Sequence, residues 1–122
     1  MSGSLKEAAR QTEIELGDKI SSILGSIKAI KNEMLDLEKR ISVEELAERI
    51  QLQGLLRKKS DELNDLSDSV VMISSDAWVI FNDMAQLYES EGVDPALLVP
   101  IRVLCKRIEV IAADLLCFSL GH

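Results

Sequence analysis

Apolar residues recur along most of the chain at alternating spacings of three and four residues, and this regularity constrains the fold more than any other feature. Such spacing keeps a stripe of side chains on one face of a helix, whereas a half-buried strand needs alternation every second residue. Three series carry the pattern: Leu16, Ile20, Ile23, Ile27, Ile30, Met34, Leu37 and Ile41; Leu63, Leu66, Val70, Ile73, Ala77, Ile80, Met84 and Leu87; Leu97, Ile101, Leu104, Ile108, Ile111, Leu115 and Phe118. The sequence therefore predicts an all-α fold with coiled-coil-like heptad packing.

Capping residues mark the ends of these series. The stretch Ser-Val-Glu-Glu that begins at Ser42 fits a capping box, so one helix is expected to end near Ile41 and the next to begin directly after it. Gly92 suits the left-handed residue that ends a helix. Asp94 followed by Pro95 suits the N-cap and first position of another helix. A helix boundary is therefore predicted on either side of residue 92.

The sequence leaves two further boundaries open. A break at Gly17-Asp18 would separate an N-terminal helical segment, and a break at Ser67–Ser69 would divide the region 43–91, because Ser and Asp side chains compete for backbone hydrogen bonds. With both breaks, the chain is a single helical domain, residues 1–122, that forms an antiparallel four-helix bundle. Its parts are an N-terminal segment over 1–17 and helices over about 18–41, 43–66, 69–91 and 95–119. Without the second break, residues 43–91 form one helix of about 70 Å.

The C-terminal region carries more apolar surface than one stripe per helix can bury. The last predicted helix is apolar nearly all round, and aromatic residues lie beside the main stripe of the helix before it. A helix of this kind has to be covered on several sides. We therefore expect a homodimer with two-fold symmetry; alternatively, the N-terminal segment folds back over the surplus. The candidate interface residues are Trp78, Phe81, Tyr88, Val99, Val103, Val110 and Leu116.

Charge is distributed unevenly along the chain. The 14 Lys and Arg residues and 21 Asp and Glu residues give a formal net charge of −7, and residues 60–101 contain no Lys, Arg or His. Direct binding to nucleic acid or to an anionic membrane is not expected, because those surfaces require clustered cations. A candidate acidic face, either a solvated surface or a contact for a basic cleft, comprises Asp61, Glu62, Asp65 and Asp68.

Residues for covalent or metal chemistry are scarce. The only histidine is His122, and Cys105 and Cys117 are twelve residues apart, which suits neither a zinc site nor a disulfide between them. We predict no catalytic, cofactor-binding or metal-binding residues, and therefore no enzyme. No stretch is long and apolar enough to span a membrane, no signal peptide is recognisable, and free thiols suit a cytoplasmic protein.

Gly25 and Gly54 are expected to allow close helix approach.

The sequence therefore predicts a non-enzymatic protein-interaction module, such as a self-associating helical adaptor, an assembly subunit or a chaperone-like protein. It would bind through apolar helix faces, with a second copy of itself as the main partner and a protein with a basic or apolar surface as another. Two alternatives remain. One is an acidic inhibitor or nucleic-acid mimic that blocks a basic cleft, and the other is a small-ligand or enzyme pocket between helices near Trp78.

Overall fold

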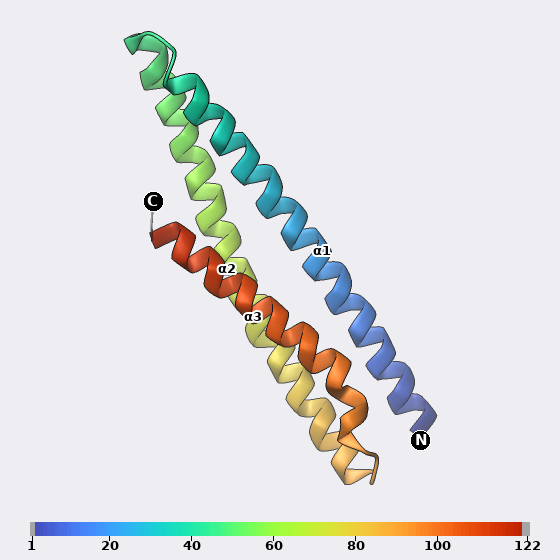
Figure 1. The fold of residues 1–122 in the computed structure, drawn as a ribbon. Helices are drawn as coiled ribbons and strands as arrows, with labels where there is room; N and C mark the ends of the chain where they lie inside the picture. Colours follow the sequence, from blue (N-terminus) through green and yellow to red (C-terminus); the bar gives the residue numbers. More distant parts are fainter. Residues whose placement is uncertain (1, 121–122) are drawn as a thin grey trace.

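The computed structural model describes residues 2–120 and consists of three α-helices and a short 3-10 turn, with no strand among these residues. The helices are α1 (Ser2–Ile41), α2 (Leu46–Ser90) and α3 (Val99–Leu120), and the turn η1 (Pro95–Leu98) precedes α3. α1 and α2 form a long antiparallel hairpin, and α3 folds back along one half of it (Figure 1). The prediction of an all-α chain is confirmed.

The predicted four-helix arrangement is not found, because α2 runs without a break through Ser67–Ser69. Ser67 is 1% exposed and lies on the same buried face as Leu63 and Val70. The weak helix preference of Ser and Asp is outweighed by the burial of this continuous stripe. The structure therefore has the single long helix that the sequence left as the alternative, about 67 Å for its 45 residues.

The expected N-terminal segment is likewise not separate, because Gly17 and Asp18 lie inside α1. Leu5 and Ala9 extend the buried stripe of α1 to its beginning, where they pack against the core. The backbone carbonyl of Leu5 accepts a hydrogen bond of 2.9 Å from the hydroxyl of Tyr88. The N-terminal residues are thus the first turns of the hairpin, and they do not form a separate cover over the outward side of α3.

The helix-end signals give mixed results. Gly92 has a φ of 70°, and the backbone amide of Val93 donates to the carbonyl of Tyr88, as in a Schellman motif. The side chain of Asp94 accepts from the amide of Ala96, which confirms the predicted cap. The capping box at Ser42 is wrong, because its hydroxyl donates back to an α1 carbonyl and α2 begins only at Leu46.

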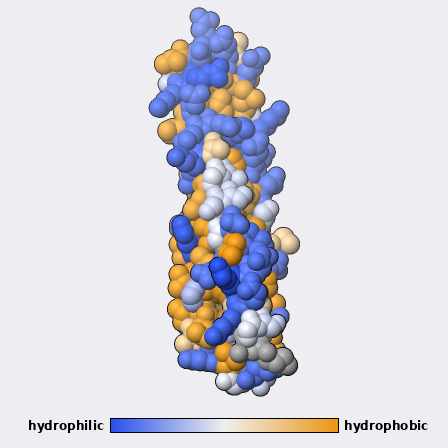
Figure 2. Space-filling view, turned by 90° about the vertical axis from the view of Figure 1, so that its right-hand side faces the viewer, coloured by the Kyte–Doolittle hydropathy of each residue, from blue (hydrophilic) through white to orange (hydrophobic). Residues whose placement is uncertain are grey.

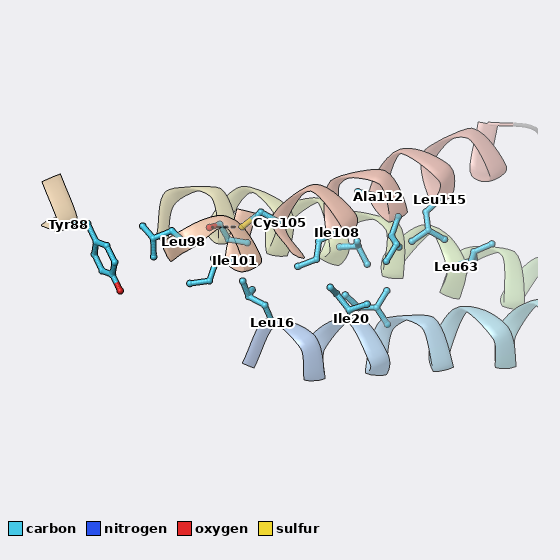
Figure 3. Packing of buried hydrophobic residues seen from close by; sticks show 14 of the residues in the cluster. Leu16, Ile20, Leu63, Tyr88, Leu98, Ile101, Cys105, Ile108, Ala112 and Leu115 are labelled. Atoms are coloured by element: carbon cyan, nitrogen blue, oxygen red, sulfur yellow. Dashed lines mark hydrogen bonds between the residues drawn. The ribbon is translucent and has the colours of Figure 1, made fainter. Parts of the chain in front are cut away.

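One core joins the three helices where α3 lies in the hairpin. Figure 3 shows the buried face of α3 directed toward Leu16 and Ile20 of α1, with Leu63 of α2 at one end of the cluster. Tyr88 lies at the other end. The residues of this face share spacings of three and four; the first, Leu98, ends η1, and the others belong to α3: Ile101, Cys105, Ile108, Ala112 and Leu115. Because α3 contributes the same face along its length, it is fixed against both long helices.

Beyond the end of α3, α1 and α2 pair as a two-helix arm, residues 32–60 (Figure 1). Met34, Leu37 and Leu52 are buried in this arm. Lys59 forms ion pairs with Glu33 of the other helix and with Glu62 of its own. The hydrogen bonds to Glu33 and then Glu62 raise the pKa of Lys59, so its ion pairs are retained up to strongly alkaline pH.

The glycines inside the helices do not serve close helix approach, contrary to the expectation for Gly25 and Gly54. A Cβ atom built at either position meets no other group within 4 Å, and the same holds at Gly92. The two helical glycines therefore cost helix stability without a packing benefit. At Gly92 the reason for glycine is its left-handed backbone.

Replacing Gly25 or Gly54 by Ala is expected to raise the free energy of unfolding by about 1 kcal/mol each, because Ala is the better helix former. Gly92→Ala has equal space but a positive φ, so it is expected to lower stability by about 1 kcal/mol. Urea unfolding followed by circular dichroism measures all three. Equal changes in the free energy of unfolding at the three positions would contradict the conclusion that only Gly92 needs glycine for its backbone conformation.

The hydroxyl of Ser67 is buried and has no hydrogen-bond partner among residues 2–120. Ser67→Ala is expected to stabilise the protein by about 1–3 kcal/mol, because it removes an unsatisfied polar group and improves helix propensity. Ser75→Ala, at an exposed position of the same helix, is the matched control for propensity alone. If both variants gain the same stability in urea unfolding, the buried hydroxyl carries no penalty.

Candidate interaction surface

α3 has two apolar faces on opposite sides. Its inner face is the buried set described above. Its other face, which we name the outer stripe, is exposed throughout and has spacings of 4-3-4-3-4. The outer stripe consists of Val99, Val103, Lys106, Val110, Ala113 and Cys117. Lys106 is its only charged member, so α3 presents to solvent a second seam of the kind that pairs helices.

Three of the predicted interface residues lie on the outer stripe. Val99, Val103 and Val110 are 53%, 59% and 50% exposed. Leu116 is also exposed, at a position adjacent to the stripe on the helix surface. Half-exposed aliphatic side chains in a row of this length leave contiguous apolar surface on one side of the molecule. The sequence prediction and the structure therefore agree on the exposure of these four residues.

Trp78 and Phe81 occupy an edge of α2 that faces α3. Their rings lie edge to face with centroids 5.7 Å apart, and both side chains are half-buried. The indole Nε1 of Trp78 donates to Oε2 of Glu109 at 2.9 Å. This bond ties the aromatic pair to α3, so a part of each ring packs in the monomer and the rest remains available at the margin of the outer stripe.

Tyr88 does not belong to the surface. It is 1% exposed, and its hydroxyl is bonded to the carbonyl of Leu5. The prediction that Tyr88 forms an interface is not supported, because α1 is helical from Ser2 and therefore reaches the level of Tyr88. The same aromatic ring that was expected to meet a partner completes the end of the core.

The surface is unevenly apolar. In Figure 2 hydrophobic atoms gather along one edge of the half that includes α3, and hydrophilic atoms cover most of the two-helix arm. The structure adds two exposed groups that the sequence did not single out as interface residues. One is on α2, with Met72 and Val79 on its outward side. The other is the tip of the arm, where Val43, Leu46 and Ile50 are exposed.

The predicted acidic residues are exposed on α2. Asp61, Asp65 and Asp68 follow at spacings of four and three and therefore share one outward face. Glu62 lies to one side of them, with Oε2 3.3 Å from Nζ of Lys59. These carboxylates form a solvated stripe, and the structure places it on a different helix from the outer stripe of α3.

Shallow hollows line the groove between α1 and α3. One of about 180 Å³ is bordered by Lys6, Arg10 and Leu97, and another of about 540 Å³ by Arg10, Gly17 and Leu104. Both are open to solvent, whereas small-molecule sites enclose most of their ligand. Trp78 lines neither of them. The alternative of a ligand pocket near Trp78 gains no support from this groove.

Side chains of the kinds that ligate metals are dispersed in the described part of the chain. Within residues 2–120 no three His, Cys, Asp or Glu side chains gather as metal ligands, and no helix there is apolar over a membrane-spanning length. The thiol of Cys105 donates to the carbonyl of Ala77, and burial raises its pKa. Cys117 is exposed, and His122 lies outside the described residues. Comparison of the chain with protein-family models, curated proteins and solved structures gives no significant match.

Tyr88→Phe removes the hydroxyl that bonds the carbonyl of Leu5. We expect the free energy of unfolding to fall by about 1 kcal/mol, the usual net contribution of one hydrogen bond; the Leu5 carbonyl keeps its place in the hydrogen-bond ladder of α1. Phe81→Leu, at a half-buried position, is the comparison variant, because it removes an aromatic ring and leaves the hydroxyl of Tyr88 in place. Self-association should not change in Tyr88→Phe, because the hydroxyl lies inside the monomer. Unchanged stability in urea would contradict the structural role of this bond.

Proposed function

We propose that this protein is a non-enzymatic protein-interaction module that self-associates through the outer stripe of α3. The observation that carries the proposal is the second seam on α3, whose valines are half-exposed although their spacing is that of a helix-pairing surface. Trp78, which is hydrogen-bonded to Glu109 of α3 and packs against Phe81, and the exposed Leu116 would extend the contact. A second helix laid along α3 would cover surface that the monomer leaves in water.

The strength of this association can be bounded. Val99, Val103 and Val110 of two copies present six half-exposed side chains, and burying the exposed half of each is worth roughly 1 kcal/mol. Bringing two chains together costs on the order of 4–15 kcal/mol in lost translational and rotational freedom. The six valines together contribute roughly 6 kcal/mol, which exceeds the lower end of that cost and falls well short of its upper end. We therefore expect a weak dimer, formed at micromolar or higher concentration, with the bordering aromatic residues contributing the remainder.

The acidic stripe of α2 separates this proposal from the nucleic-acid-mimic alternative. Asp61, Asp65 and Asp68 face outward from α2, on a different helix from the proposed contact. Reversing all three to Lys should leave the dimer intact, because screened charges of this kind add little to an apolar contact elsewhere. Loss of binding to a basic partner, with the dimer intact, would instead identify the stripe as a second contact.

Val103→Glu should disrupt the dimer, because it places a charge in the middle of the apolar seam. The matched control is Val79→Glu, since Val79 is 56% exposed and Val103 59%, and Val79 lies on the outward side of α2. In sedimentation equilibrium, wild-type and Val79→Glu proteins should approach twice the monomer mass of 13.5 kDa as concentration rises. Val103→Glu should remain near 13.5 kDa. A wild-type protein that stays monomeric up to millimolar concentration would overturn the proposal.

A further inference from the structure

The two-helix arm, residues 32–60, lacks the third helix that supports the other half of the hairpin (Figure 1). Its buried side chains are Met34, Leu37 and Leu52, and of these only Met34 belongs to the core cluster that joins the three helices. Several of its other large aliphatic side chains are exposed: Leu35, Val43, Leu46, Ile50 and Leu55. The arm therefore buries little apolar surface for its length.

The half of the hairpin that α3 covers is packed more completely. Leu16, Ile20 and Ile23 of α1 are at most 5% exposed there, and Leu63 and Val70 of α2 at most 1%. The inner face of α3 belongs to the same cluster along its whole length. Burial of apolar surface is the dominant favourable term in folding, and a segment with few buried apolar contacts opens more readily than a packed core. The arm is therefore the less stable half of the molecule.

Polar contacts do not compensate for this difference. The ion pair of Lys59 with Glu33 lies at the base of the arm, and both side chains are partly in water, where an ion pair adds little stability. At the tip, Nε of Arg49 donates to the carbonyl of Glu44 within the same turn of chain. Glu45, which precedes α2, makes no side-chain cap. Apolar contacts are therefore the main interactions that hold the two helices of the arm together.

Two contacts mark the boundary between the arm and the covered half. Nζ of Lys31 in α1 lies 4.5 Å from the ring centre of Phe118, near the end of α3. Two residues further along α1, Glu33 forms its ion pair with Lys59 of α2. An opening that starts at the tip is expected to stop at this level, because each further turn would have to break contacts with α3 as well.

We propose that the two-helix arm opens as a separate unit: residues 32–60 lose their pairing and their helical hydrogen bonds while the half covered by α3 stays folded. Such local opening is the expected behaviour of a segment held by few buried apolar contacts. Leu37 and Leu52, which the closed arm buries, become accessible in the open state. The fold thus exposes apolar side chains without loss of its core. This inference does not rest on the proposed self-association, which involves the other half of the molecule.

Amide hydrogen exchange in the full-length protein measures the opening of each half. It is followed residue by residue by NMR, at a concentration at which sedimentation shows the monomer. The amides of Leu37 and Leu52 should exchange at least about tenfold faster than those of Val70 and Ile108. Equal rates in the two halves would show a single cooperative unit and overturn the proposal. Fast exchange limited to the one turn of helix on either side of the tip would show fraying of helix ends and would also overturn it.

The two helical glycines supply a matched pair of variants, since a Cβ atom meets no other group within 4 Å at either position. Gly54 lies in the arm, and Gly25 lies in the covered half, next to Leu24, which borders a hollow together with Leu115 of α3. Gly54→Ala should slow exchange in the arm about fivefold, because Ala favours the closed helix. Gly25→Ala should slow exchange of the core amides about fivefold and leave the arm unchanged, because residue 25 stays helical when only the arm opens. An equal effect of Gly25→Ala on both halves would overturn the proposal.

Limited digestion with a low concentration of trypsin gives a second readout. Exposed basic residues occur in both halves, such as Arg49 and Arg57 in the arm and Arg10 and Arg102 in the covered half. Cleavage should begin within the arm, because trypsin cuts a helix only after it opens. Gly54→Ala should slow this first cut about fivefold, whereas Gly25→Ala should not change its rate. A first cut in the covered half would contradict the separate opening of the arm.

Discussion

The packing of the inner face of α3 against both long helices is the interaction on which the rest of the structure depends. Leu98, Ile101 and Ile108 are almost fully buried there, and they close a core that α1 and α2 supply from two sides. A two-helix hairpin has only a narrow seam to bury and is stable chiefly through what packs on it. Because α3 is half the length of α2, this support is given to one half of the hairpin, and the remainder projects as the two-helix arm (Figure 1).

The sequence predicted the helical faces better than it predicted the helix ends. The buried stripe through Leu63, Val70 and Ala77 follows the expected spacing, and the caps at Gly92 and Asp94 are present. The break at Ser67–Ser69 is wrong because a local preference of a few tenths of a kcal/mol per residue cannot compete with a continuous buried stripe. No single residue in that stretch indicates that the buried stripes before and after it belong to one helix. The number of helices could therefore not be predicted from the local sequence.

The candidate surface was predictable in part. Val99, Val103 and Val110 were recognisable as surplus apolar residues, and the regular spacing that joins them to Lys106 and Cys117 is visible in the sequence once α3 is known to bury its opposite side. Tyr88 could not be placed in the same way. Its burial depends on α1 reaching its level, and that depends on helix continuity through Gly17, which the isolated sequence leaves open.

The two faces of α3 make folding and association separable. The inner face is already covered in one chain, so residues of the outer stripe contribute little to the stability of the monomer, and their apolar character needs a different explanation. Solubility alone would favour polar residues at these positions. A second helix laid along the outer stripe would remove these valine side chains from water, and this would account for their apolar character.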